Sequence, residues 1–440
     1  MSETAAEARV NHRKVLAIAI PIVISNLSTP LLGIADTAVM GRMGDPKYIG
    51  AVAIGALIFT MVYWTFGFLR MGTTGLTAQA LGAMDGEEIR ASLGRALLIA
   101  GAVGAALIAL QFPIGLAAFA LLDGGEEVER LARNYFDIRI WSAPFALANY
   151  ALVGWFIGLG RANIALALQV FLNLVNIFFN IALALGLGWG VAGIAAGTLI
   201  AEVAAALAGL AVAARHLRFY PGQWTRARLM DAARLARTVA VNRDIMIRTI
   251  VLMFSFAWFT AKSAEAGAVT LAANSILLQF VTVSAFFLDG FALAAEALVG
   301  KAFGARSRED FDLSARLSTL WAAGIACTLS LGIFAFGGFV IDFLTIDAEV
   351  RAAARVYLFW AAMLPVLSVW CYQLDGIFIG ATRGPEMRNA ALASSALFLT
   401  LWWLLLPYGN HGLWAALAGF NLMRAASLGF YYPRLGRALA

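Results

Sequence analysis

Charged residues are scarce in this chain. Asp, Glu, Lys and Arg make up 13% of its 440 residues, against about 25% in an ordinary globular domain. The two cysteines, Cys327 and Cys371, lie in apolar stretches without the spacing of a disulfide or a metal pair. The three histidines form no cluster with acids or cysteines that would bind a metal. These shortages exclude an ordinary globular domain, predict no cofactor or metal site, and disfavour an enzyme.

Long apolar stretches take the place of the missing charge. The chain is 62% hydrophobic, with a mean hydropathy of +0.81. Twelve stretches are long enough to cross the roughly 30 Å hydrocarbon core as helices. They lie near residues 15–40, 48–70, 93–121, 136–159, 164–186 and 191–213, and near 246–263, 268–299, 317–345, 356–380, 389–408 and 412–432. The sequence therefore predicts an all-α polytopic membrane protein with 12 transmembrane helices.

The two sets of six stretches are copies of one another at a constant offset of 222 residues. Arg133, Tyr135, Gly154, Phe156, Ile157, Gly158 and Arg161 recur as Arg355, Tyr357, Gly376, Phe378, Ile379, Gly380 and Arg383. The small-xxx-small pairs Gly154/Gly158 and Gly376/Gly380 predict close helix approach. Because six is an even number, the copies form two parallel repeats around a central cavity. An internal duplication of this kind indicates a transporter, with its site where the halves meet.

Lys and Arg residues gather on one side of the predicted membrane. They lie in the N-terminal segment (1–14), the linker (214–243), the 300–316 loop and the C-terminal segment (433–440), whereas acids such as Asp123 and Glu127 lie in the opposite loops. Positive loops face the cytoplasm, which predicts cytoplasmic termini flanking an N-lobe (15–213) and a C-lobe (244–432). The net charge of +6 is then a topology signal that calls for no nucleic acid. Alternating apolar and basic residues predict that the linker forms an amphipathic helix on anionic lipid.

Ionisable residues inside spans are costly and are functional candidates by default. In the first half they are Asp36, Arg70, Asp137, Arg139 and Glu202. Asp36 follows Pro21 and Pro30 on the first predicted helix, and prolines let a helix bend. A carboxyl group in a low dielectric favours its neutral form, so Asp36 is a candidate proton carrier on a hinged helix. A structural acid near the helix end is the alternative.

Polar residues on the fifth and sixth predicted helices extend this candidate site. Asn173, Asn176 and Asn180 share one helix face, and Thr198 lies one turn before Glu202. The amides either line a wet cavity or bond a neighbouring helix. Whether Glu202 accepts from Arg70 or neutralises Arg139 is left open, and Asp137 is a further N-lobe ionic partner.

The second half does not repeat this chemistry. The offset of 222 places Trp258 at the position of Asp36, and Arg424 at that of Glu202. Instead, Asp289 and Glu296 lie two turns apart on one face of their helix, and with Asp375 and Arg424 they predict a second intramembrane ionic cluster. Both a structural ion-pair network and a transport site are consistent with this set.

Several ordered strings give the chain a specific resemblance. They are PLLGIADTAVMG (30–41), LRMGTTGLTAQA (69–80), NRDIMIR (242–248), LDGFA (288–292), WCYQLDGIFIGATR (370–383) and GNHGLW (409–414). With these strings the chain resembles the multidrug and toxic compound extrusion (MATE) transporters, and among them the DNA-damage-inducible F (DinF) branch, over about its whole length. The resemblance implies two six-helix lobes that alternate access and exchange amphipathic, mostly cationic drugs for external protons or Na⁺.

For the coupling site, the resemblance implies that protonation of Asp36 bends its helix at Pro21 and expels the drug. Asn180 and Thr198 fall on positions that accompany this acid. Where the family commonly has a second Asp, this chain has Ala184, and the lost ligand and charge favour H⁺ over Na⁺. The chain is thus expected to work as a monomeric proton-coupled antiporter in the inner (plasma) membrane.

Three alternatives stay open. A Na⁺-coupled multidrug antiporter would use the C-lobe acids Asp289, Glu296 and Asp375. A flippase for lipid-linked oligosaccharide, from the wider superfamily, would call for a more cationic central cavity or more spans. A membrane-embedded enzyme would need clustered nucleophiles, histidines or metal ligands within the spans, and the sequence contains no such cluster.

Overall fold

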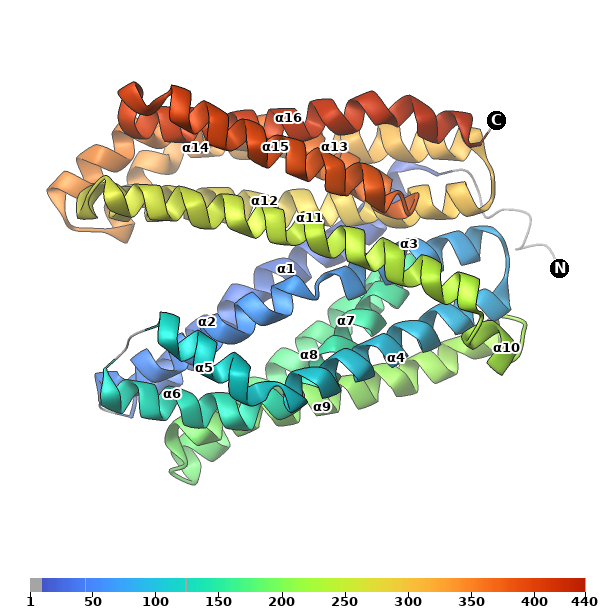
Figure 1. Ribbon diagram of the computed structural model, residues 1–440, viewed down its shortest axis with the longest axis horizontal. Helices are drawn as coiled ribbons and strands as arrows, with labels where there is room; N and C mark the ends of the chain where they lie inside the picture. The colour runs from blue at the N-terminus through green and yellow to red at the C-terminus, as the bar shows by residue number, and fades with distance from the viewer. Residues whose placement is uncertain (1–9, 44, 123–124, 440) are drawn as a thin grey trace. The chain divides into compact units, whose positions relative to one another are not determined.

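The computed structural model describes residues 10–43, 45–122 and 125–439, and helices are the only regular structure within them (Figure 1). Asp123 and residues 1–9 of the predicted N-terminal segment lie outside these residues. The first half contains α1 (His12–Gly41), α2 (Pro46–Thr65), α3 (Phe68–Gly82), α4 (Gly86–Ala109), α5 (Gln111–Leu121), α6 (Glu126–Arg139), α7 (Ala143–Gly158), α8 (Ala162–Asn180) and α9 (Gly190–His216). The second contains α10 (Arg226–Leu229), α11 (Ala232–Glu265), α12 (Ala268–Gly304), α13 (Arg308–Leu344), α14 (Ala348–Gly380), α15 (Gly384–Leu404) and α16 (Gly409–Arg437). Short helical turns cover Ile140–Ser142, Ile181–Gly186, Leu217–Phe219 and Leu406–Tyr408.

Every predicted span falls on one of these helices or on a pair of them. Ten helices or continuous pairs are each long and apolar enough to cross a membrane, and α15 and α16 pass as a joined pair. The pairs α2/α3 and α6/α7 each count as one span, and α5 is a shorter apolar helix that follows α4. The all-α polytopic prediction is confirmed.

The duplication is visible in the helix boundaries. Helices α2, α4, α6 and α8 begin at residues 46, 86, 126 and 162, and the same positions plus 222 are 268, 308, 348 and 384, where α12, α13, α14 and α15 begin. The starts follow from local chemistry, because Asp85 and its repeat mate Ser307 each accept a hydrogen bond from the backbone as N-caps. The halves differ in continuity: α12 and α14 are unbroken where their mates are the pairs α2/α3 and α6/α7.

The chain divides into two compact units. Unit 1 holds residues up to Val23, 81–84 and from Val239 onward; unit 2 holds residues 24–80 and 85–238. Helices α1 and α11 thus each contribute to both units. In unit 1, α14 packs against α12, α13 and α16, and Phe259 meets Trp414 edge-on in the core. In unit 2, α9 packs against α6, α7 and α8, and α4 packs on α7.

The predicted amphipathic helix across the linker is wrong. Helix α9 continues to His216, and α11 already begins at Ala232 and runs without a break into the span. No proline or glycine interrupts residues 232–265, so the helix propagates through the predicted boundary. Only the four-residue α10 remains between α9 and α11, apart from the turn at Leu217–Phe219.

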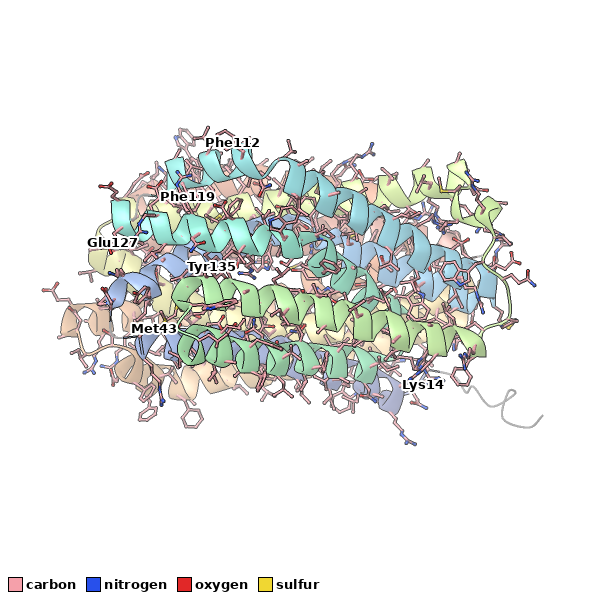
Figure 2. The ribbon with its side chains drawn as sticks, turned by 90° about the horizontal axis from the view of Figure 1, so that it is seen from below. Lys14, Met43, Phe112, Phe119, Glu127 and Tyr135 are labelled. Carbon is pink, nitrogen blue, oxygen red and sulfur yellow. The ribbon has the colours of Figure 1, made fainter. Side chains whose placement is uncertain are left out.

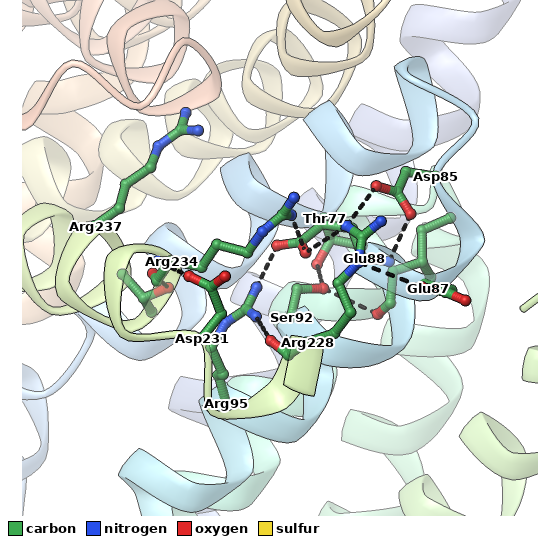
Figure 3. Close-up of polar contacts among 12 residues, drawn as sticks. Thr77, Asp85, Glu87, Glu88, Ser92, Arg95, Arg228, Asp231, Arg234 and Arg237 are labelled. Atoms are coloured by element: carbon green, nitrogen blue, oxygen red, sulfur yellow. Dashed lines mark hydrogen bonds and ion pairs between the residues drawn. The ribbon is translucent and has the colours of Figure 1, made fainter. Parts of the chain in front are cut away.

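The segment between α9 and α11 is bound to the start of α4, where α10 lies (Figure 1). Arg90 Nη2 donates to the Leu217 carbonyl at 2.7 Å, and Arg95 Nη1 donates to the Arg228 carbonyl at 2.9 Å. Figure 3 shows the accompanying ion pairs, in which Glu88 binds both Arg95 and Arg234. Two linker arginines, Arg228 and Arg234, thus pair with acids at the start of α4. We call the set of contacts that joins Arg90, Arg95 and Glu88 to the linker the linker clamp.

Candidate functional site

The four residues predicted for proton coupling form one hydrogen-bonded chain inside unit 2. Asn180 Nδ2 donates to Asp36 Oδ1 at 2.7 Å and to Asn176 Oδ1 at 2.9 Å. Asn176 Nδ2 donates to Thr198 Oγ1 at 3.0 Å, and that hydroxyl donates to the Ile194 carbonyl. Helix α8 brings the two amides together because they lie one turn apart. The chain thus links α1, α8 and α9.

Asn180 retains an unused acceptor. Its side chain is fully buried, and its Oδ1 has no hydrogen-bond partner among the described residues. Gly197 of α9 makes room for this atom, since a Cβ at position 197 would lie 2.1 Å from it. Helix α8 also ends at Asn180 and continues as a π-turn over Ile181–Gly186, a deviation that is frequent at functional sites. An unpaired buried oxygen beside a carboxyl suits a proton donor or a cation.

A second polar line meets this chain from α6. Arg139 Nη1 donates to Tyr135 Oη at 2.6 Å, and its guanidinium lies 4.7 Å from the centre of the Phe59 ring. The Tyr135 side chain also interacts with that of Thr198. Figure 2 shows Tyr135 on α6, and Glu127 lies at the start of the same helix. The sequence did not indicate a role for Tyr135, although this residue is part of the repeated Arg-x-Tyr string.

The partner of Glu202 is an amide. Asn149 Nδ2 of α7 donates to Glu202 Oε2 at 2.8 Å and to the Glu202 carbonyl at 3.0 Å. Neither of these hydrogen bonds comes from Arg70 or Arg139, the two arginines that the sequence offered as partners. Arg70 is half-buried on α3, and Asp137 is exposed on α6. The exposure of Asp137 separates it from the buried chain around Asp36.

The two predicted hinge prolines both lie within α1, which is a continuous helix in this structure. Pro21 is buried, whereas Pro30 is exposed. The helix changes units between Val23 and Ile24, just beyond Pro21. Bending at either proline stays a prediction.

In unit 1 the structure brings Asp375 of α14 and Arg424 of α16 together as an ion pair. Asp375 also binds Arg248 of α11, so one buried carboxylate holds two guanidinium groups. The sequence-based set omitted Arg248, although it lies two residues inside the span predicted at 246–263. Asp289 is half-buried and interacts electrostatically with Tyr372, and Glu296 is buried on the same helix, α12.

A small cavity lies in unit 1 beside Pro365 of α14. Ser284, Ser368, Tyr372 and Asn421 contribute polar groups to its lining. The Ser284 hydroxyl is buried and has no hydrogen-bond partner among the described residues. Asn421 also accepts from Arg424 at 3.5 Å, so the cavity adjoins the Asp375 ion pairs. No group of three or more acids, histidines and cysteines in the described residues has the geometry of a metal site.

Comparisons with known proteins match both halves of the chain. The family model described as MatE matches the chain twice, over residues 21–182 and 245–406, once in each half. DNA damage-inducible protein F of Escherichia coli K12 is 39% identical over 425 residues, which cover 95% of this chain and 91% of the relative. A probable multidrug resistance protein NorM of Caulobacter vibrioides is 26% identical over 93% of this chain and 90% of its own length.

Solved structures share the fold at low sequence identity. A MOP superfamily transporter from Pyrococcus furiosus superposes with a TM-score of 0.87 at 18% identity, covering 97% of this chain and 96% of that one. A crystal structure of MATE in the bent conformation gives a TM-score of 0.85 at 20% identity, with 97% and 95% covered. The fold predicted from the repeats, two six-helix lobes, is that of these transporters.

Proposed function

The chain belongs to the MatE family of membrane transporters, and from this premise we propose that it exports amphipathic, mostly cationic organic compounds in exchange for protons. Asp36 is the coupling residue of the proposal. Its environment supports this role: one carboxylate inside a span, bound by a buried amide. The name of the Caulobacter relative, a probable multidrug resistance protein, supports the substrate class.

Antiport follows if the drug and the proton compete for one charge. Deprotonated Asp36 attracts a cation, and protonation removes that attraction. Two unit charges about 4 Å apart interact by about 4 kcal/mol at an effective dielectric constant of about 20, which corresponds to between two and three orders of magnitude in affinity. Proton uptake on one side of the membrane would therefore release the drug there.

The surroundings of Asp36 favour H⁺ over Na⁺ in this proposal. A protonated Asp36 would carry an O–H donor. The unpaired acceptor nearby is Oδ1 of Asn180, and the same amide already donates to Asp36 through its Nδ2. With Ala184 in the place of a second carboxylate, Na⁺ would find fewer charged ligands. In unit 1, the two arginines on Asp375 disfavour a cation site at that acid.

The proposal also includes location and assembly. The protein is a multi-pass membrane protein, and we place it in the inner (plasma) membrane as a monomer with both termini cytoplasmic. The support for this orientation is the excess of Lys and Arg at the termini, in the linker and in the 300–316 loop.

The test is efflux of a cationic dye from proteoliposomes under an imposed pH gradient or, separately, an imposed Na⁺ gradient. Asp36→Asn keeps an acceptor for Asn180 and removes the titratable group. Asp312→Asn is the matched control, because Asp312 is an exposed carboxylate on α13 that pairs with Arg308. We expect the pH gradient to drive efflux in the parent and in D312N but not in D36N. Efflux driven by Na⁺, or undiminished in D36N, would refute coupling through Asp36.

A further inference from the structure

Two tryptophans of unit 1 take the places that Asp36 and its amide hold in unit 2. The offset of 222 residues puts Trp258 of α11 at the position of Asp36, and Trp402 of α15 at that of Asn180. Where Asn180 donates a hydrogen bond to Asp36, the two indole rings pack edge to face, with their centres 5.3 Å apart and their planes at 84°. We call Trp258 and Trp402 the aromatic pair.

The aromatic pair already holds a cation. The ammonium group of Lys262, one turn beyond Trp258 on α11, lies over both rings, 5.0 Å from the centre of each. The face of an aromatic ring attracts a cation within about 6 Å, and tryptophan attracts it most strongly. Aromatic rings grouped around one ammonium are also how proteins recognise quaternary ammonium ligands. The pair therefore has the chemistry of a site for organic cations.

A second contact lets Lys262 leave the rings without losing its counter-charge. Its Nζ also binds the two carboxylate oxygens of Glu265, at 2.6 and 2.7 Å. The Glu265 side chain is 64% exposed, so this ion pair does not depend on the aromatic pair. A ligand cation that displaced the ammonium from the rings would meet a neutral Lys262–Glu265 pair, which repels it far less than a lone lysine would.

The aromatic pair faces the core of unit 1, which distinguishes it from tryptophans that lie against lipid headgroups. Trp403, the next residue on α15, is of the exposed kind at 65%. Trp258 and Trp402 instead pack against the buried core. Nε1 of Trp258 is buried and has no hydrogen-bond partner among the described residues. This N–H can therefore donate to an acceptor atom of a bound compound.

We propose that Trp258 and Trp402 form a second binding site for organic cations, in unit 1, which the ammonium group of Lys262 occupies when no ligand is bound. This inference rests on the proposed function, from which it takes the cationic substrate class. The tryptophans carry no titratable group, so the aromatic pair recognises the cation without exchanging it for a proton. That exchange stays at Asp36.

The experiment measures equilibrium binding of ethidium, an aromatic cation, to the detergent-purified protein by fluorescence. Lys262→Met removes the competing ammonium, so K262M should bind ethidium about tenfold more tightly than the parent. Lys262→Arg keeps a cation over the rings and should bind as the parent does. Each variant is also measured together with Asp36→Asn, which removes the charge of the unit 2 site, and the differences should persist there.

The aromatic ring is tested on α15. Trp402→Leu should weaken ethidium binding about tenfold, and Trp402→Phe should weaken it less, because phenylalanine keeps a ring. Trp403→Leu is the matched control and should leave the affinity unchanged, since its side chain is exposed. In the double variant K262M/W402L, the gain from removing Lys262 should be smaller than in K262M alone. If W402L does not fold, W402F carries this comparison.

A pair of competitors of the same shape tests whether the site selects for charge. Phenyltrimethylammonium and tert-butylbenzene differ in the nitrogen cation that replaces a carbon atom. The cation should displace ethidium from K262M at a concentration at least about tenfold below that of the neutral compound. Equal displacement by both compounds would mean that K262M has only gained an apolar surface, and would overturn the proposal.

The possible outcomes separate this inference from the proposed function. A parent protein that ignores the pH gradient would refute proton-coupled export, even if the variants bind ethidium as expected. A proton-driven parent in which K262M binds no more tightly and W402L and W402F no more weakly would overturn the aromatic site alone. Equal weakening in W402L and W403L would do the same, because the loss would then not come from the ring that faces Lys262.

Discussion

A Cβ atom on Gly376 of α14 would lie 2.2 Å from the carbonyl oxygen of Ala292 on α12, so the two helix backbones are in direct contact at this point. The same contact exists in unit 2, where a Cβ on Gly154 of α7 would lie 2.3 Å from the carbonyl oxygen of Arg70 on α3. Subtracting 222 from 292 and 376 gives 70 and 154. The duplication therefore preserves individual helix contacts as well as helix boundaries.

We predict that Gly154→Ala and Gly376→Ala each destabilise the protein. The nearest atoms are backbone, which a side-chain rotation cannot move away, so the helices must separate. Overpacking of this kind costs typically about 1–3 kcal/mol. Thermal unfolding of the detergent-purified protein should show a lower midpoint for both variants.

Gly101→Ala and Gly324→Ala are the controls for this prediction. Both glycines lie within helices, α4 and α13, and a Cβ at either position meets no atom within 4 Å. Alanine favours a helix over glycine by up to about 1 kcal/mol, so these variants should be neutral or slightly more stable. Equal destabilisation at all four positions would contradict the contact argument.

The ion pairs of Asp375 lead to a second prediction. Asp375→Asn removes the only carboxylate shown to bind both Arg248 and Arg424 among the described residues, and leaves two guanidinium groups underpaired. Breaking a buried ion pair from one side costs about 3–5 kcal/mol. We expect a large fall in the unfolding temperature, and a loss of transport in proportion to the loss of folded protein.

Asp347→Asn is the control on the same helix. Asp347 caps the start of α14 by accepting from the Val350 amide at 2.9 Å, and Asn is about as good a cap as Asp. This variant should be nearly neutral. A D375N protein that remained stable but changed its coupling ion would instead assign Asp375 to transport.

The linker clamp gives a third prediction. Glu88 binds the buried Arg95 and also Arg234 at the start of α11 (Figure 3). Glu88→Gln removes the shared charge and turns an amide N–H toward one of the guanidinium groups. We expect about 3 kcal/mol of destabilisation. Trypsin should then cleave the linker arginines faster, because local opening exposes the backbone.

Glu87→Gln separates this effect from a general loss of acid. Glu87 is adjacent in sequence, is 37% exposed, and pairs with Arg228 at 3.3 Å. An exposed pair of this kind contributes about 0–1 kcal/mol, so cleavage of E87Q should match the parent. If E88Q were also cleaved at the parental rate, the clamp would not limit opening of the linker.

Features that depend on local sequence were predictable. The offset of 222 residues recurs in the observed helix starts, and the spacing of Asn176 and Asn180 predicted that the two amides share one helix face, where they hydrogen-bond to each other. Thr198 was assigned only through the family resemblance, and its bond to Asn176 depends on how α8 packs against α9.

Features that depend on packing between helices were not predictable. Glu202 had two arginines as candidate partners in the sequence, but α7 places Asn149 against it. Asp137 is only two residues from Tyr135 on α6, yet one is exposed and the other buried, because they lie on opposite faces of the helix. The breaks between α2 and α3 and between α6 and α7 could not be predicted from the repeat, because the two halves align without a gap and the matching helices α12 and α14 are unbroken.

The last prediction concerns the proposed hinge in α1. Pro21 lacks the N–H that would bond the carbonyl one turn earlier, and α1 passes from unit 1 to unit 2 two residues later, after Val23. Pro21→Ala restores that bond, and alanine favours a helix interior by about 3 kcal/mol. We therefore expect an unchanged or higher unfolding temperature together with slower proton-driven dye efflux. Pro30→Ala is the comparison, because Pro30 is exposed and lies wholly within the unit 2 part of the helix. If P30A slowed efflux more than P21A, the hinge would lie beside Asp36 and away from the point where α1 changes units.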